Sequence, residues 1–338
     1  MLERLGHHKA KSFSDIEVGT TVEMSLLLVS ATCALTKRNT KYYTLLLRDE
    51  TEREMQAKVW DEATLPPNMK CASVYDIVAN VGVYNGNKQL SVTLMGESEL
   101  SPSMFAIKPP IKYDDEQLWK ELVDIVSSFT EPVAKFLGEE LLTDDNLVNE
   151  IKTAPAAKSI HNNWVGGLLE HAVALCRLAT SSIEQYKRYY PQLSRDKILL
   201  GCLIHDLGKI HEFKLNQGNI EYTPFGYLIG HITWGPVWVS KKIDKFIKSR
   251  PMDDTIGRRV ENDQFEIIHI IASHHGKLEY GSPVVPSTIE AIIVHGLDML
   301  DTHAMHAIKK IEKEGDVPGF SERSYPYNTC FKLGGKPS

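Results

Sequence analysis

One apolar run that ends in a histidine and an aspartate constrains the fold of this chain more than any other feature. Residues 199–204 read Leu-Leu-Gly-Cys-Leu-Ile, and His205, Asp206 and Gly208 follow at once. A helix that is apolar on nearly all sides is a buried helix, and glycine commonly ends helices. We therefore predict a buried helix that stops at Gly208 and presents His205 and Asp206 at its negative end, where both can bind a divalent cation.

Histidines are concentrated in the second part of the chain. Of the thirteen, only His7 and His8 precede residue 161, and the others lie between His161 and His306. Imidazole is the commonest metal-binding side chain and the usual acid–base group near neutral pH. Metal or acid–base chemistry is therefore expected in the second part.

Composition limits the class of protein. A chain of 338 residues is expected to form two domains, and a net charge of −6 argues against a strongly basic protein that coats nucleic acid. The five cysteines form no C-x-x-C pair, which favours reduced thiols in the cytoplasm. Residues 1–13 lack the apolar run of a signal peptide, and residues 25–35 are too few to cross a bilayer. We expect a cytoplasmic protein without a membrane partner. The sequence leaves open whether the protein forms a homo-oligomer.

The first hundred residues have the pattern of a small β-barrel. The segment 55–60 alternates apolar and polar residues, and Asn85-Gly86 is a strong hairpin-turn signal. Five segments are rich in strand-forming residues, at 22–31, 42–47, 55–60, 74–84 and 89–94. Residues 1–100 are therefore predicted to form a five-stranded Greek-key barrel of the OB type.

The order of these segments resembles the nucleic-acid-binding OB family, although the usual glycines of the first loop and of the turn after Asp49 are absent. Such barrels stack bases on aromatic rings beside basic side chains. The resemblance implies the following contacts: Tyr43, Trp60 and Tyr84 for bases, and Lys37, Arg38, Lys41 and Lys58 for phosphates. The alternative is that the aromatic residues form the core and that the barrel docks proteins.

The remainder reads as a linker, a helical domain and a tail, so the whole is predicted to be a multi-domain α+β protein. Residues 101–113 contain three prolines without periodicity and are expected to link the domains. Residues 114–315 show helical spacing with one hairpin near 213–222, and residues 316–338 are expected to be irregular.

Candidate metal ligands lie on the inner faces or at the ends of the predicted helices. His171 shares the inward face of a helix with Leu168 and Leu175. Asp298 lies in the apolar helix 289–300, where a carboxylate is costly unless it is paired or binds a metal. The full set is His171, His205, Asp206, His231, His274, His275 and Asp298.

The order of this set resembles the HD-domain metallophosphohydrolases in their two-metal form. The resemblance implies one ion held by His171, His205, Asp206 and Asp298, with Asp206 bridging to a second ion held by His231, His274 and His275. Manganese, or else iron, cobalt or magnesium, suits such ligands better than calcium. Two metals about 3.5–4 Å apart can activate a water and stabilise the entering and leaving oxygens at phosphorus. Lys209, which completes an H-D-x-G-K motif, would neutralise phosphoryl charge, so Asp206 and Lys209 are the candidate catalytic residues.

Three segments extend the match to the YhaM-type family of 3′-5′ exoribonucleases, which join an OB barrel to an HD domain. These segments are 158–171, 222–224 together with 228–231, and 273–283. The resemblance implies metal-dependent hydrolysis of terminal phosphodiester bonds in single-stranded RNA, with single-stranded DNA left open. Asn162 stands where that family commonly has a second histidine, so the substrate pocket is expected to differ in detail.

A substrate pocket is expected at the start of the His171 helix. Gly166 and Gly167 would let a phosphate approach the amides of that helix start, and Lys158, His161 and Asn162 would line the same entrance. The alternative is that Asn162 and Asn163 merely cap the helix.

Two other functions stay open at this point. The HD site would hydrolyse small nucleotides or cyclic dinucleotides, with the barrel serving assembly or regulation. Alternatively, the protein would bind single strands without catalysis, with a structural metal site.

Overall fold

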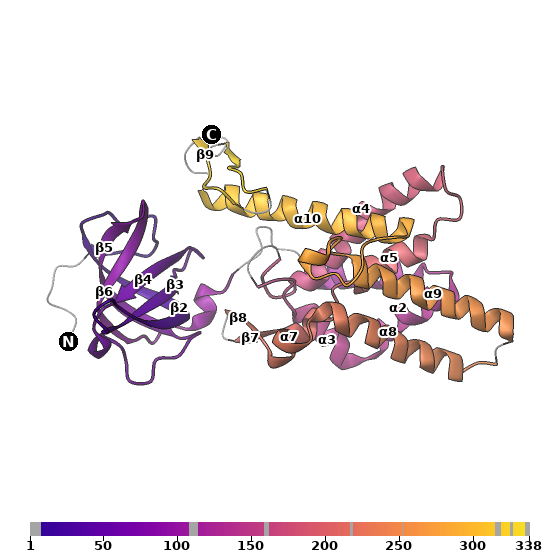
Figure 1. Cartoon of the computed structure of the whole chain (residues 1–338), viewed down its shortest axis with the longest axis horizontal. Helices are drawn as coiled ribbons and strands as arrows, with labels where there is room; N and C mark the ends of the chain where they lie inside the picture. The colour runs from indigo at the N-terminus through magenta and orange to yellow at the C-terminus, as the bar shows by residue number, and fades with distance from the viewer. Residues whose placement is uncertain are drawn as a thin grey trace. The chain divides into compact units, whose positions relative to one another are not determined.

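The structure is a computed structural model that describes residues 8–107, 114–158, 162–216, 219–251, 253–314, 319–324 and 327–334. The chain divides into two compact units (Figure 1). The first comprises Met1–Ile107 with Leu215–Asn219, and the second comprises Lys108–Lys214 with Ile220–Ser338.

The first unit contains the predicted five-stranded barrel. Its strands are β2 (Thr21–Leu35), β3 (Lys41–Arg48), β4 (Glu54–Val59), β5 (Val74–Tyr84) and β6 (Asn87–Glu97). They pair in the order β2-β3-β4-β6-β5, and β5 pairs back to β2, which closes the barrel. The β4–β6 pair is parallel and the others are antiparallel. The short strand β1 (His8–Lys9) joins β2 in parallel.

Alternation along the strands places the barrel core. Leu45 and Leu47 on β3 are fully buried, as are Leu26 and Leu28 on β2. The β5–β6 turn has Asn85 and Gly86 at φ of 51° and 84°, the left-handed conformation that this dipeptide adopts in tight hairpins. A short 3₁₀ helix η1 (Glu62–Thr64) follows β4.

The barrel unit extends past residue 100. The 3₁₀ helix η2 (Pro102–Phe105) places Phe105, which is fully buried, against Leu27 and Val74. Residues 102–107, which the sequence assigns to the linker 101–113, therefore pack with the barrel. Residues 108–113 lie outside the described part.

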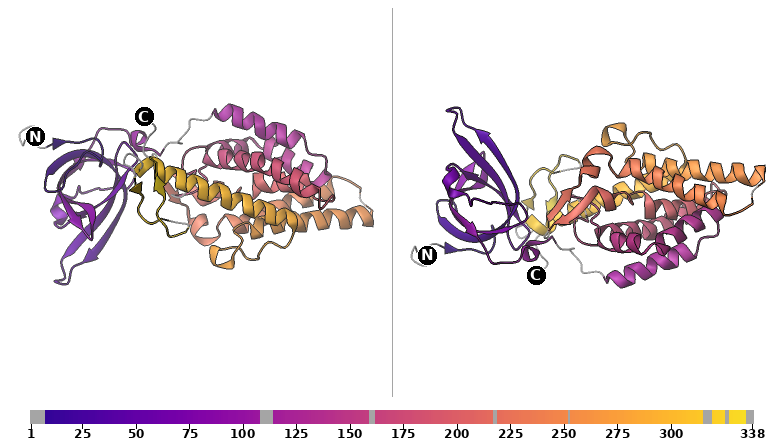
Figure 2. Two further views of the ribbon diagram at one scale, coloured as in Figure 1. Left: turned by 90° about the horizontal axis from the view of Figure 1, so that it is seen from above. Right: turned by 90° about the horizontal axis from the view of Figure 1, so that it is seen from below.

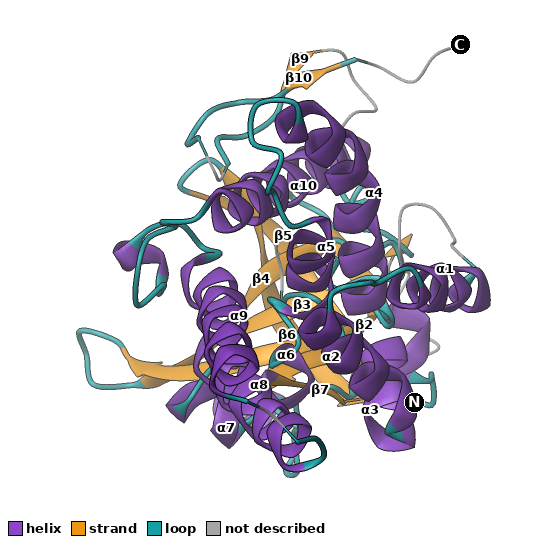
Figure 3. Ribbon diagram, turned by 90° about the vertical axis from the view of Figure 1, so that its right-hand side faces the viewer, coloured by secondary structure: helices purple, strands orange, loops and turns teal. Residues whose placement is uncertain are grey.

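The second unit is a helical bundle, and Figure 3 draws its helices in purple. Its helices are α1 (Asp115–Ser127), α2 (Pro132–Thr143), α3 (Asp145–Thr153), α4 (Gly167–Lys187), α5 (Arg195–Ile204), α6 (Lys209–Glu212), α7 (Pro224–Leu228), α8 (His231–Lys248), α9 (Asp254–Ser273) and α10 (Ile289–Glu314), with a 3₁₀ helix η3 (Leu278–Tyr280). All residues of α5 except Arg195 are buried, and α4, α9 and α10 pack against the helix (Figure 2). Within the described ranges, no helix is both long and apolar enough to cross a bilayer.

Short strands also occur between and after these helices. The predicted hairpin is present as β7 (Phe213–Asn216) and β8 (Asn219–Tyr222). The tail is more ordered than its composition indicated, because β9 (Gly319–Phe320) and β10 (Lys332–Leu333) pair antiparallel.

Asp196, in the first turn of the central helix α5, fixes the α1–α2 connection. Its carboxylate accepts hydrogen bonds from the backbone amides of Thr130 (2.6 Å) and Glu131 (2.8 Å). Burial alone would raise the pKa of Asp196, but these donors outweigh it and hold the pKa below its usual value.

Asp196→Ala should lower the free energy of unfolding at pH 7 by about 1–3 kcal/mol, because it leaves two amides without their acceptor. Since the folded-state pKa is depressed, the carboxylate stabilises the fold above its unfolded pKa, near 3.9, and this contribution is lost as pH falls through the folded-state value. Urea unfolding at pH 7 and pH 3 measures the difference. The exposed Asp244→Ala on α8 is the control; equal effects of the two variants would contradict the prediction.

Candidate metal centre

The His-Asp pair lies in a turn, not inside a helix. Helix α5 ends at Ile204, and α6 begins at Lys209, so His205 and Asp206 occupy the bend between them. Gly208 has an ordinary φ of −63°, which corrects the prediction that it terminates the helix by conformation. Glycine is required there by close approach, because a Cβ would lie 2.6 Å from the backbone oxygen of His231.

The helices bring all seven candidate ligands to this bend. His171 comes from α4, His231 is the first residue of α8, and Asp298 comes from α10. His274 caps the end of α9, and His275 follows it. Three groups have ligand atoms within 4.8 Å of one another: His171, His205 and Asp298; His205, Asp206 and His274; and His231, His274 and His275.

Asp206 faces the imidazoles with both carboxylate oxygens. Its Oδ2 lies 3.4 Å from Nε2 of His205 and 3.9 Å from Nε2 of His171. Its Oδ1 lies 3.4 Å from Nε2 of His231 and 3.5 Å from Nε2 of His274. The two oxygens of the Asp206 carboxylate therefore lie near two different pairs of histidines.

Hydrogen bonds at Nδ1 orient the histidine rings. His205 donates to the carbonyl of Cys202 at 3.1 Å, and His274 donates to that of Ile271 at 2.6 Å. His275 donates to the carbonyl of Tyr280 at 2.7 Å. A ring whose Nδ1 donates has its Nε2 lone pair available to a metal.

The donor atoms fit a divalent cation. The Nε2 atoms of His205, His231 and His274 and the Oδ1 atom of Asp206 are buried and have no hydrogen-bond partner among the residues that the structure describes. Buried polar atoms are rarely left in this state. Because these atoms converge, a cation bound by imidazole and carboxylate satisfies all of them.

The electrostatics of the centre also favour a cation. Burial lowers the pKa of His275 to about 4 and lowers that of His274, which keeps both rings neutral as metal binding requires. Burial would also lower the pKa of His171, but the carboxylates of Asp298 and Asp301 outweigh it and raise the pKa to about 10. Carboxylates that attract a proton so strongly also attract a metal ion.

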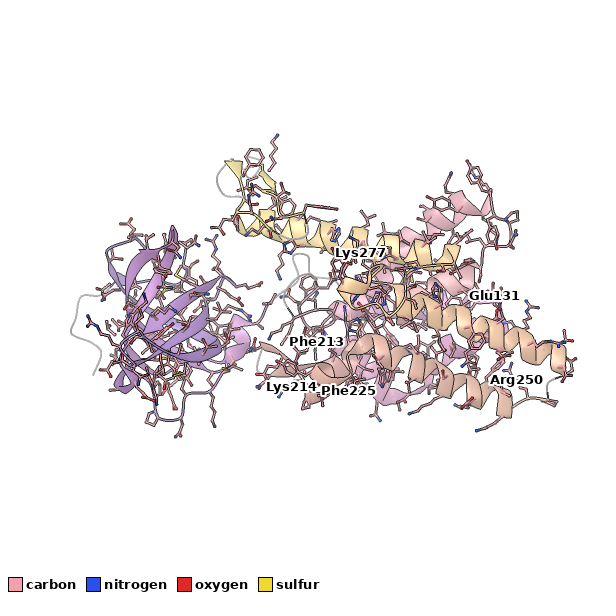
Figure 4. The ribbon with its side chains drawn as sticks, viewed as in Figure 1. Glu131, Phe213, Lys214, Phe225, Arg250 and Lys277 are labelled. Carbon is pink, nitrogen blue, oxygen red and sulfur yellow. The ribbon has the colours of Figure 1, made fainter. Side chains whose placement is uncertain are left out.

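A pocket of about 350 Å³ opens beside this centre. Lys209 lines it, with its Nζ 2.6 Å from Oδ2 of Asp206. Lys158, a predicted substrate contact, lines it as well, and so does Phe213, which Figure 4 labels in the helical unit. A phosphate at the centre would therefore meet a lysine ammonium.

The helix start expected to receive a phosphate is already bonded to the protein. The amide of Gly166 donates to Thr153, that of Gly167 to Trp164 and that of Leu168 to Ala154. This corrects the phosphate role predicted for Gly166 and Gly167. Asn162 is buried and does not line the pocket, and His161 lies outside the described residues.

On the barrel, Lys58, Trp60 and Tyr84 line one groove of about 210 Å³. Trp60 is 58% exposed and stacks on Tyr42 at 5.3 Å, while Nζ of Lys58 lies 4.9 Å from the Tyr42 ring centre. Tyr42, which the sequence analysis did not select, thus completes this surface.

Tyr43 does not belong to that groove. It is partly buried, packs against the barrel core and donates its hydroxyl hydrogen to Glu62 at 2.6 Å. Its stacking role stays a prediction. Lys41 pairs with Glu62 at 3.4 Å, and Lys37 and Arg38 are exposed in the β2–β3 turn.

Sequence reasoning missed two carboxylates behind the ligands. Glu212 accepts hydrogen bonds from the backbone amide of His231, at 2.8 Å, and from its Nδ1. Asp301 accepts a hydrogen bond from Nδ1 of His171 at 2.8 Å. The spacing of Asp301 from Asp298 along one helical face was a usable signal; the role of Glu212 depends on the return of the chain after the β7–β8 hairpin.

Comparison with known proteins is consistent with this geometry. The profile of a family described as "HD domain" matches residues 168–303. The chain is 30% identical over 327 residues to a protein of Geobacillus sp. (strain WCH70) named 3′-5′ exoribonuclease YhaM, covering 94% of this chain and 92% of that protein. It is 29% identical to the proteins of the same name from Listeria monocytogenes and Listeria innocua, covering 95% of this chain and 99% of each relative.

Two solved structures are among the structural matches to this chain. The second OB-fold domain of replication protein A from Methanococcus maripaludis is 19% identical, with a TM-score of 0.23, covering 28% of this chain and 97% of that one. An OB domain from Methanosarcina mazei is 16% identical, with a TM-score of 0.26, covering 32% and 100%. The closed five-stranded topology itself establishes the fold class.

Glu212→Gln should weaken divalent cation binding about 10–100-fold, because an amide holds the His231 ring and its Nδ1 proton less well than a carboxylate does. Titration of the metal-free protein with Mn²⁺ in a calorimeter measures the dissociation constant. Glu221→Gln, on neighbouring β8 and paired with Lys214, is the matched control. An unchanged Mn²⁺ affinity in Glu212→Gln would contradict the role given to Glu212.

Proposed function

The chain belongs to the YhaM family of 3′-5′ exoribonucleases, and we propose that it removes nucleotides from the 3′ end of single-stranded RNA at the HD centre. The observation that carries this proposal is the grouping of the seven candidate ligands beside a pocket that Asp206 and Lys209 line. Single-stranded DNA is a second substrate to be tested.

Each group of the pocket has a separate task. Divalent cations, when bound, would polarise the phosphodiester and lower the pKa of a water molecule. Lys209 would neutralise charge that develops on the phosphoryl oxygens. In the reaction, a water oxygen forms a bond to phosphorus as the P–O3′ bond breaks. The leaving oxygen takes a proton, which yields a nucleoside 5′-monophosphate and a strand with a new 3′ hydroxyl.

We propose two cations, with manganese as the first candidate. The two oxygens of Asp206 point to different histidine pairs, as expected of a carboxylate that bridges two metals. His171, His205 and Asp298 form the ligand group on one side, and His231, His274 and His275 form the group on the other.

The barrel groove supports the choice of a polymeric substrate. An exposed tryptophan stacked on a tyrosine, with a lysine over that tyrosine, is a suitable surface for an unpaired base and its phosphate. A hydrolase of small nucleotides has no need of such a surface. We propose that Lys58, Trp60 and Tyr84, together with Tyr42, bind the strand.

Asp206→Ala should abolish cleavage and leave strand binding within about twofold, because the carboxylate serves the metal centre and not the barrel. The measurement is a time course on 5′-labelled single-stranded RNA with Mn²⁺, with and without chelator, alongside binding of the same RNA. The wild-type protein should give an Mn²⁺-dependent ladder that shortens from the 3′ end.

The exposed Asp145→Ala on α3 is the control for this experiment. Cleavage that survives in Asp206→Ala, with contaminating nucleases excluded, would contradict the assignment. RNA left intact by the metal-loaded wild type, combined with turnover of mononucleotides or cyclic dinucleotides, would favour the small-nucleotide alternative. If the metal-loaded wild type cleaves neither RNA nor these small nucleotides, the result would favour the alternative of a non-catalytic protein that binds single strands.

Trp60→Ala should raise KM for a long single-stranded RNA about 5–150-fold, which corresponds to the 1–3 kcal/mol of one base–aromatic stack. The turnover number and the KM for a dinucleotide should change little, because neither depends on the barrel groove. Val18→Ala, another exposed apolar residue of the barrel unit, is the control. Equal effects of Trp60→Ala on the long and the short substrate would argue against strand binding in the groove.

A further inference from the structure

Two chemically different sets of residues line the pocket beside the metal centre, and we call them its walls. The charged wall includes the side chains of Asp206, Asp298 and Lys209, together with the rings of His231 and His275. The other is mainly apolar and aromatic and includes Ala156, Ala157, Phe213, Tyr222, Tyr280 and Met299. Phosphodiester hydrolysis explains the first wall. It does not explain why apolar side chains and rings line the second.

Tyr222 is the best-supported ring of this second wall. Its ring centre lies 5.0 Å from that of Phe213 and 5.1 Å from that of Tyr227. Gly226 on α7 approaches so closely that a Cβ there would lie 3.1 Å from the Tyr222 ring. The half-buried Tyr222 ring is therefore fixed by its neighbours, as expected of a preorganised binding surface.

The aromatic wall also carries positive charge. Nζ of Lys158 lies 5.4 Å from the Tyr222 ring centre, and Lys158 lines the same pocket. A purely apolar ligand has no use for this ammonium. A ligand with both a flat π face and an anionic group can use the ring and the lysine together.

We propose that Tyr222 stacks on the base of the 3′-terminal nucleotide and so forms a nucleobase subsite next to the metal centre. This inference rests on the proposed exonuclease function and adds to it the part of the substrate that the pocket recognises. A pocket of about 350 Å³ is near the lower end for small-molecule sites, which suits one nucleotide.

The subsite gives a physical reason for cleavage one nucleotide at a time. A base held on Tyr222 places its own 5′ phosphate toward the charged wall, so the terminal phosphodiester bond is the one presented for hydrolysis. Stacking is tolerant of sequence because every base has a π face. The subsite should therefore distinguish a nucleotide from an abasic residue more strongly than one base from another.

The first test compares two single-stranded RNAs that differ only in whether the 3′-terminal residue carries its base. The wild type should show a KM about 5–150-fold higher for the abasic end, and Tyr222→Ala should reduce this ratio to about one. Tyr222→Phe keeps the ring and should keep the preference. Tyr189→Ala, a 78% exposed tyrosine just beyond α4, is the control.

The second test does not depend on RNA cleavage. Calorimetric titration of the Mn²⁺-loaded protein with adenosine 5′-monophosphate and with ribose 5-phosphate measures what the base contributes to binding. The wild type should bind adenosine 5′-monophosphate about 5–150-fold more tightly than ribose 5-phosphate, and Tyr222→Ala should lose that preference.

The two tests separate the subsite from the exonuclease function. Equal wild-type affinities for the two ligands, or a preference that survives in Tyr222→Ala, would overturn the subsite even if RNA is degraded. Intact RNA together with a preference that depends on Tyr222 would overturn the exonuclease function and keep the subsite.

Discussion

The burial of one carboxylate governs the helical unit. Asp206 is 3% exposed, and a charged group in such a place is unstable without compensation. Burial would raise the pKa of Asp206, but the Lys209 ammonium and the surrounding imidazoles hold it well below its usual range. The residues that compensate this charge come from the ends or inner faces of separate helices. The metal centre therefore forms only when these helices pack together.

That assembly depends on positions that the ligand pattern does not reveal. The α5–α6 turn can lie against the start of α8 because Gly208 has no Cβ to meet the His231 backbone. Glu212, which follows on α6, then holds the His231 ring from behind. The short segment between Asp206 and the β7–β8 hairpin therefore holds His231, a ligand from α8, close to Asp206.

The two units carry different parts of one proposed task. The barrel offers an aromatic groove with a lysine beside it, whereas the helical pocket offers a metal centre beside a supported tyrosine. Each surface combines a π face with positive charge, as suits a base and its phosphate. The barrel groove would retain a strand, and the helical pocket would place one terminal phosphodiester bond for hydrolysis.

The sequence alone determined the closed barrel, the helical domain and the seven candidate ligands, because alternation, helical spacing and costly buried charges are local properties. It predicted an Asn85-Gly86 turn and a hairpin near residues 213–222, and the structure has both. Only the tertiary structure decided which amides and rings remain accessible. It paired the amide of Gly166 with the carbonyl of Thr153, stacked Tyr42 on Trp60, and brought Tyr222 into the pocket beside the metal centre. These outcomes depend on contacts between separate segments of the chain, which a local sequence pattern does not show.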